Sequence, residues 1–359
     1  MKIKKLIAPV LLAGLVFGML IVPSLAEPGF LQQKDQKEAT QPAAKIFIPK
    51  EVRDVMLQGL QARQVRQDIP FSIFKSTILP AQTAFYIVPF LKIKNADLPF
   101  APVAAPQAAD AAAAPAQPKV KATFDVFLQF HKLENGVPTQ IVKEVYVPTT
   151  QEQDAATYDP NKEEWYTIAY PLLPGNYLLA MAVTTHDLKK IGTQYFEFSL
   201  PDLKSFTKEL ETTYVFFLKD YKELPAAETV AELHKGYFRY SIAQFTPSVD
   251  NVLAFGEATE VFFLVLGAQP NEQNKYDIEC QYDVKEGDKD AIKFAPTKYE
   301  TPFISQPLFM KQTLLTKDKD GKESQESRDL PAGNYTFTIK LTDKVSGRTC
   351  TKAVDFTVK

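Results

Sequence analysis

Cysteine, histidine, tryptophan and glycine are all scarce in this chain. It holds two cysteines, three histidines, one tryptophan and 14 glycines among 359 residues. So few cysteines exclude a disulfide-rich scaffold, and so little glycine beside 26 phenylalanines indicates a well-packed chain. Beyond the N-terminus, no apolar run is long enough to span a bilayer.

The one long apolar run has the form of a signal peptide. Met1–Lys5 carries three lysines, the apolar stretch Leu6–Val22 follows, and small residues precede Glu27. We predict a signal peptide over 1–26 and an exported protein, periplasmic or secreted, with an uncleaved N-terminal anchor as the alternative. No cysteine follows the cut, which argues against a lipid anchor there.

The charge of the chain argues against nucleic acid as a partner. Residues 1–26 hold three of the 41 basic residues and none of the 43 acidic ones, so the mature chain carries a net charge of about −5. A mildly acidic chain is poorly suited to a polyanion. About 330 residues remain, which ordinarily make two domains, each with its own core.

An internal repeat organises the mature sequence. The matched segments, first copy named first, are 83–90 and 259–266, 124–130 and 276–282, 175–177 and 333–335, and Phe198 and Phe356. Their order is the same in both copies, which indicates a duplicated domain. The first copy is longer between its two early strands, where the Ala/Pro-rich stretch 97–119 predicts an extended loop insertion.

Period-two alternation predicts strands in both copies. In 335–342 the odd positions are apolar and the even positions polar, as in a strand with one buried face. Turn signals at 134–136, 286–288, 320–321 and 346–347 separate such segments. Short strands at this spacing, without long helices between them, predict an all-β chain.

Two corner sequences carry a family resemblance. Leu173–Tyr177 and Leu330–Tyr335 resemble the corner before strand F of immunoglobulin-like and fibronectin-like domains, where a tyrosine hydroxyl bonds back to the backbone. The resemblance covers most of both copies and implies two related immunoglobulin-like β-sandwich domains in tandem. Leu179 and Phe337 stand where antibody-type domains have cysteine, so no functional residues follow from it.

Two short helices are expected beside the sandwiches. After Pro49, the stripe Val52, Val55, Met56 and Leu60 predicts a helix that lies on a sheet, and Pro225–His234 predicts a second helix between the domains. The expected organisation is a signal peptide over 1–26, a disordered linker over 27–48, a helix plus first domain over 49–202, a connector over 203–237 and a second domain over 238–359.

No motif for catalysis or metal binding emerges. His131, His186 and His234 are scattered, and each is interpreted as an ordinary surface or loop residue. We therefore expect no catalytic residue, no cofactor and no metal site. A glycosidase-like pair of carboxylates is neither excluded nor indicated, because any β fold of this size could bring two together.

Two local patterns have a plain and a functional interpretation. Asp318–Gly321 resembles the start of a calcium loop, but Thr316 and Ser327 occupy ligand positions, which favours a charged hairpin turn. Trp165, Tyr166 and Tyr170 could stack on sugars, as in a carbohydrate-binding module, or belong to a core. The core interpretation is the commoner one for such a cluster.

The two cysteines pose a question of pairing. Cys280 and Cys350 alternate in phase with apolar neighbours, so both are expected to point inward. An oxidising compartment favours a disulfide between them. In the strand order C, F, G they would lie about 9 to 10 Å apart, beyond the reach of a disulfide. The bond is left open.

The contrast between the two copies gives the functional prediction. The outward positions of strands C, F and G in the second copy are Glu279, Thr336, Thr338, Lys340 and Ala353, which suit water. The same positions in the first copy are Phe127, Leu178, Ala180, Ala182 and Tyr195. Such an apolar sheet face is normally covered. The covering could be the predicted helix at 52–60, the insertion, the second domain or another molecule.

This face is the candidate interaction surface. We predict a non-catalytic, exported binding, adhesion or envelope-assembly protein that acts through contacts with an unidentified protein partner. The alternatives are a carbohydrate-binding module, which needs an exposed row of aromatics including Trp165, and a hydrolase of extracellular polymer, which needs a cleft with two carboxylates of shifted pKa.

Overall fold

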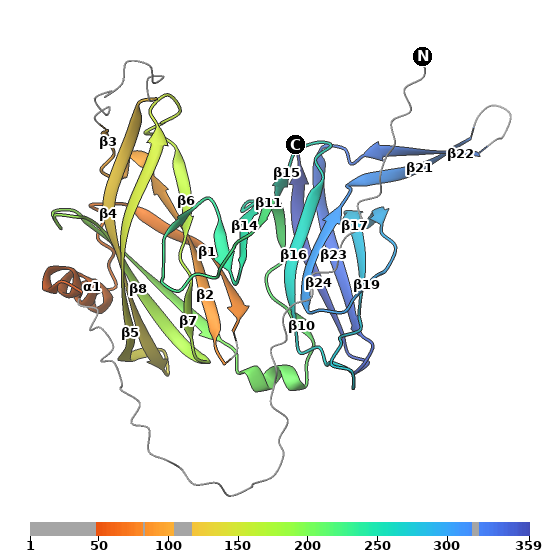
Figure 1. Ribbon diagram of the computed structural model, residues 1–359, viewed down its shortest axis with the longest axis horizontal. Helices are drawn as coiled ribbons and strands as arrows, with labels where there is room; N and C mark the ends of the chain where they lie inside the picture. Colours follow the sequence, from red (N-terminus) through yellow and green to blue (C-terminus); the bar gives the residue numbers. More distant parts are fainter. Residues whose placement is uncertain (1–47, 82, 104–116, 318–322) are drawn as a thin grey trace, which may run out of the picture. The chain divides into compact units, whose positions relative to one another are not determined.

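A computed structural model describes residues 48–81, 83–103, 117–317 and 323–359 (Figure 1). Most of these residues are in strands, and the helices among them are α1 (Lys50–Ala62) and the short 3-10 helices η1 (Asn95–Asp97) and η2 (Leu203–Thr207). Within these ranges no helix is long and apolar enough to cross a bilayer.

Several predictions concern segments outside the described residues. They are the signal peptide over 1–26, the linker up to residue 47, most of the Ala/Pro-rich insertion and the turn at Asp318–Gly321. The described residues, from Ile48 to Lys359, belong to one compact unit.

Two facing sheets form the first pair. One has the order β1-β2-β6-β12 with β7 also paired to β2, and the other has the order β3-β4-β8-β9 with β5 paired to β4. Phe85 and Leu91 of β2 meet Phe124 and Leu128 of β4 in the core between them. The strands are β1 (Phe71–Pro80), β2 (Phe85–Lys94), β6 (Glu163–Thr167), β7 (Tyr170–Leu172), β12 (His234–Lys235), β3 (Ala101–Pro102), β4 (Lys119–Glu134), β5 (Val137–Asp154), β8 (Gly175–Thr185) and β9 (Ile191–Leu200).

The second pair repeats this plan around its own core. One sheet has the order β10-β16-β11-β14-β13 with β20 paired to β16, and the other has the order β15-β24-β23-β17-β18 with β19 paired to β17. Its strands are β10 (Glu211–Thr212), β11 (Phe216–Glu223), β13 (Phe238–Tyr240), β14 (Ala243–Pro247), β15 (Val252–Leu253), β16 (Thr259–Leu266), β17 (Ile278–Glu286), β18 (Lys289–Lys293), β19 (Thr297–Tyr299), β20 (Phe303–Leu308), β23 (Gly333–Asp343) and β24 (Thr349–Val358). A hairpin of β21 (Lys311–Lys317) and β22 (Glu323–Asp329) adjoins them.

The repeat found in the sequence falls on equivalent strands. β4, β8 and β9 lie in the same order in their sheet as β17, β23 and β24 do in theirs. At the start of β8 the hydroxyl of Tyr177 donates to the carbonyl oxygen of Leu173 at 2.9 Å. At the start of β23 the hydroxyl of Tyr335 donates to the carbonyl oxygen of Pro331, also at 2.9 Å. The hydrogen bond expected at each corner is therefore present.

A third apolar cluster joins the outer faces of β2 and β16. On β16, Phe263 points into the second core while its neighbour Phe262 points away from it. Phe262 packs with Phe245 at 4.1 Å between ring centroids, and Phe90 of β2 lies 6.0 Å from Phe216 of β11. We call this the phenylalanine cluster; its buried members are Leu79, Val88, Phe90, Phe216, Leu218, Phe238, Ala243, Phe245, Phe262 and Leu264. It explains why β2 and β16 are apolar on both faces.

The predicted connector over 203–237 is largely built into the sheets. The chain enters the second pair at β10 and β11, returns to the first pair at β12, which pairs with β6, and crosses again to β13. The helix predicted over Pro225–His234 is wrong: residues 224–233 are irregular, and His234 starts a strand. Pairing of His234 with Thr167 of β6 outweighs the local helical pattern.

Candidate functional site

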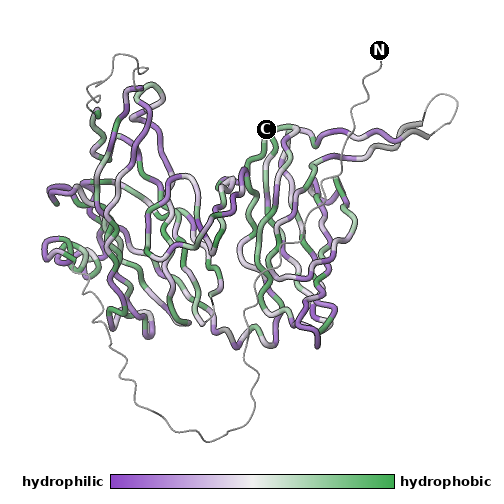
Figure 2. Tube along the Cα trace, viewed as in Figure 1, coloured by the Kyte–Doolittle hydropathy of each residue, from purple (hydrophilic) through white to green (hydrophobic). Residues whose placement is uncertain are grey.

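Helix α1 covers the apolar face predicted as the interaction surface. Phe127, Leu178, Ala180 and Ala182 are buried and Tyr195 is half-buried, in one cluster with the helix. From the helix side, the predicted stripe supplies fully buried Val52 and Met56, with Val55 and Leu60 partly buried. Hydrophobic and hydrophilic positions both occur along α1, as an amphipathic helix requires (Figure 2). The face is therefore not exposed: of the four coverings considered from the sequence, the helix of the chain itself is the one that lies on it.

Specific polar contacts fix α1 on this face. The hydroxyl of Tyr195 on β9 donates to the carbonyl oxygen of Met56 at 2.8 Å. A Cβ at Gly59 would lie 2.1 Å from that hydroxyl oxygen, so the absence of a side chain permits the close approach. Arg53 forms an ion pair with Glu144 of β5 at 3.3 Å.

A polar chain runs from this ion pair across the sheet. The Gln129 side-chain amide donates to Oε1 of Glu144 at 2.8 Å, and Nε2 of His131 lies 2.8 Å from Oε1 of Gln129. Gln129 and His131 are both buried, so His131 is not the surface residue expected from the sequence. Burial lowers the pKa of His131. The lowered pKa keeps the ring neutral at neutral pH, so His131 contributes a hydrogen-bonding group to this chain of contacts and not a charge.

A groove of about 870 Å³ opens beside the C-terminal half of α1. It has one wall from the helix and the turn after it, a second wall from the β4–β5 hairpin, and further lining from β8 and β9. Its lining residues are Leu57, Gly59, Leu60, Gln61, Arg63, Val65, His131, Gly136, Val137, Pro138, Thr139, Ile141, Leu178, Tyr195 and Glu197. Leu178 and Tyr195 are the two members of the predicted face that reach it.

The rim of the groove is apolar and exposed. Leu57, Val65, Val137 and Ile141 have 47%, 41%, 60% and 45% of their surface accessible. Single exposed apolar residues are ordinary, but four around one concave site form a patch of the kind that binds other molecules. The groove can therefore hold an apolar side chain or a short apolar segment.

The backbone conformations of two turns determine where both walls of the groove lie. Asn135 and Gly136 have φ of 53° and 76°, which lets the chain turn tightly from β4 into β5. Arg63 adopts a left-handed conformation that ends α1. The Asn135-Gly136 pair predicts the hairpin, but nothing in the sequence indicates that its side chains line the same groove as Leu57.

The aromatic residues considered for sugar binding are packed rather than arrayed on the surface. Tyr166 is fully buried. Half-buried Trp165 stacks on Phe90 at 5.8 Å, and Tyr170 stacks on Phe130 at 5.3 Å. The exposed row that a carbohydrate-binding module needs is not formed by these three residues.

The carboxyl groups offer no general acid with a raised pKa within the described ranges. A catalytic acid works with a pKa raised toward the operating pH. All the carboxyl groups there with a resolved shift have a lowered pKa: Asp68, Asp187, Glu211, Glu279, Asp290 and Glu326.

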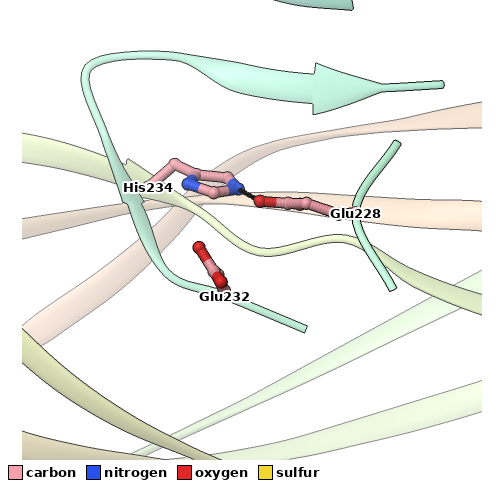
Figure 3. A group of neighbouring side chains, drawn as sticks. All are labelled: Glu228, Glu232 and His234. Atoms are coloured by element: carbon pink, nitrogen blue, oxygen red, sulfur yellow. Dashed lines mark ion pairs between the residues drawn. The ribbon is translucent and has the colours of Figure 1, made fainter. Parts of the chain in front are cut away.

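One histidine belongs to a group that could hold a metal ion, which sequence reasoning missed. Glu228, Glu232 and His234 place their ligand atoms within 4.8 Å of one another (Figure 3). His234 is buried rather than a loop surface residue, whereas His186 is exposed and contacts Asp125. The available signal was the occurrence of two glutamates and a histidine within seven residues.

The two cysteines are free thiols. Cys280 of β17 and Cys350 of β24 both pair with Leu341 of β23, from opposite sides. Two strand spacings place their α-carbons about 10 Å apart, whereas a disulfide needs about 7 Å or less. The disulfide considered from the sequence is therefore not formed, because β23 lies between the two strands.

Comparison of the sequence with protein families and with curated proteins adds nothing to the description of the fold and the groove. No protein-family model matches the chain, and no curated protein matches it in sequence.

Proposed function

We propose that this chain is an exported, non-catalytic binding protein, and that the groove beside α1 holds an apolar segment of a partner protein. The observation that carries the proposal is the exposed rim of Leu57, Val65, Val137 and Ile141 around one concave site. Exposed apolar surface of this kind is costly in water and is typical of interaction sites.

The structural class in this proposal is a pair of immunoglobulin-like modules. The equivalent strand orders and the two corner hydrogen bonds of Tyr177 and Tyr335 support it. Modules of this type bind through loops, faces and edges of a rigid scaffold. The groove has that character, since its walls are a docked helix and a two-stranded hairpin.

Charge placed on the rim tests the proposal. Val137→Asp and Ile141→Asp would each put a carboxylate on an exposed position, so the fold is expected to survive while binding of an apolar segment is lost. The measurement is affinity enrichment from the native envelope, quantified by mass spectrometry, with circular dichroism to check folding. Val345→Asp is the matched control, because Val345 is 40% exposed on a turn of the second pair.

The expected result is a partner retained by the wild type and by Val345→Asp and lost from both groove variants. If the four proteins retain the same set, the groove does not bind the partner and the proposal is wrong.

A further inference from the structure

A compact group of ligand-type side chains lies where the return segment after β11 leads into β12. Glu228, Glu232 and His234 come from this one segment and converge, with all ligand atoms within 4.8 Å (Figure 3). Glu228 is half-buried, Glu232 is exposed and His234 is buried. The site therefore has a buried nitrogen on one side and a carboxylate open to solvent on the other.

His234 is the unusual member. Its side chain is only 4% exposed, and its ring stacks on Tyr237 at 4.8 Å. Nε2 lies 2.7 Å from Oε1 of Glu228, yet no atom meets this nitrogen in hydrogen-bond geometry. Buried polar atoms nearly always have a partner that satisfies them. A buried nitrogen that is paired with a carboxylate but makes no hydrogen bond of regular geometry is suited to a ligand shared with that carboxylate.

The charges around the site leave room for a divalent cation. Nη1 of Arg239 lies 3.0 Å from Oε1 of Glu228 and neutralises one of the two carboxylates. With a neutral imidazole, the two carboxylates and this guanidinium sum to a net charge of −1. No ion pair with a basic side chain is described for Glu232. Its carboxylate charge is therefore available to a bound cation.

The donor set indicates the kind of ion. One imidazole nitrogen and two carboxylate oxygens are ligands that zinc and its neighbours take, with water completing the coordination. Calcium and magnesium prefer oxygen ligands alone. A site with a buried nitrogen therefore favours a transition metal over these two ions.

We propose that Glu228, Glu232 and His234 bind a divalent transition-metal ion of the zinc class, and that this ion fastens residues 228–232 to His234 at the start of β12, which pairs with β6 of the first pair of sheets. Nε2 of His234 and one oxygen of each glutamate are the protein ligands, and water occupies the remaining position.

The role follows from the small number of backbone pairs that hold the segment. β12 makes only two residue pairs with β6, His234 with Thr167 and Lys235 with Tyr166. Residues 224–233 before it are irregular. An ion bound to the native segment and not to the unfolded chain stabilises the native state by mass action. The site lies outside the groove, so absence of metal binding at the site would leave the proposed partner binding unaffected.

The test uses the mature chain with any affinity tag removed and after dialysis against a chelator. Zinc binding is measured by isothermal titration calorimetry, thermal unfolding is followed with and without zinc, and cobalt is added as a spectroscopic substitute. The variants are Glu232→Gln, which changes an exposed ligand without disturbing the core, and His234→Gln. Glu209→Gln, an exposed glutamate elsewhere, is the control.

The expected result is one zinc bound per chain with micromolar or tighter affinity, a thermal midpoint raised by a few degrees, and a visible cobalt band. Glu232→Gln is expected to weaken zinc binding by at least about tenfold, whereas Glu209→Gln matches the wild type. Absence of zinc binding in the wild type, or binding that Glu232→Gln leaves unchanged, overturns the proposal even if His234→Gln does not fold.

Discussion

At the residue scale, Asp343 is a fully buried carboxylate at the end of β23. It accepts hydrogen bonds from the backbone N–H groups of Gln269 and Val345, at 3.1 and 3.2 Å, and from the hydroxyl of Ser346. Nη2 of Arg348 lies 3.9 Å from it. The same guanidinium donates to carbonyl oxygens before β10 and after β16, so this pair ties three loops together.

Removal of this carboxylate should be severely destabilising. Asp343→Ala leaves buried donors without their acceptor and a half-buried guanidinium without its counter-charge, and we expect a loss of about 3 to 5 kcal/mol in the free energy of unfolding. Urea unfolding measures it. Glu326→Ala, which removes an exposed ion pair with Arg328, is the comparison and should leave the midpoint unchanged. Equal effects of the two variants would contradict this role for Asp343.

The cysteine thiols should be free and slow to react. Burial raises the pKa of Cys280 to about 12 and that of Cys350 to about 11, so little thiolate, the reactive form, is present at neutral pH. We expect alkylation of the folded protein to be slow, to accelerate as pH rises, and to reach both thiols quickly in denaturant. Mass spectrometry without prior reduction measures this. A protein that stays unlabelled in denaturant until reductant is added would contain the disulfide that the strand order forbids.

At the element scale, the docking of α1 depends on the close approach of Gly59 and Tyr195. Gly59→Ala would ordinarily stabilise a helix by about 1 kcal/mol. Here the new Cβ meets the Tyr195 hydroxyl, so we predict the opposite sign, with α1 loosened and its apolar face opened. Hydrogen exchange of residues 50–62 and binding of a hydrophobic dye measure it.

A second substitution separates this steric cause from a general loss of stability. Tyr195→Phe removes the hydroxyl, so the double variant should recover part of the protection lost in Gly59→Ala. Recovery is partial because the backbone oxygen of Gln64 would still lie 2.6 Å from the new Cβ. A Gly59→Ala protein with protection equal to that of the wild type would show that this contact does not hold the helix.

The elements differ in how well the sequence predicts them. Strands such as β23 follow from period-two alternation, and α1 follows from the stripe that includes Val52 and Met56, because one buried face imposes the period. The segment before His234 misled the prediction, since its conformation is set by pairing with β6, a contact more than 60 residues away. The groove could not be predicted from the sequence for the same reason, because Leu57 and Ile141 line one groove only in the folded chain.

At the scale of the whole molecule, the phenylalanine cluster should make the two pairs of sheets unfold together. Trp165, the only tryptophan, packs against the cluster from the first pair, and Cys280 lies in the core of the second pair. We predict coincident denaturation midpoints for tryptophan fluorescence and for Cys280 labelling. Phe262→Ala should lower both midpoints together, with a cost of about 3 to 5 kcal/mol. Two separate midpoints in the wild type would show that the pairs of sheets unfold independently.

Binding of a partner in the groove beside α1 can be tested by site-specific photo-crosslinking from position 141 in the native cell. A photoreactive residue in place of Ile141 points from β5 into the groove, and the same residue in place of Val345 serves as the control. We expect position 141 to capture one partner protein, through an apolar segment identified by peptide mapping, and position 345 to capture none. Crosslinks from position 141 only to the chain's own residues would show that the groove does not hold a partner.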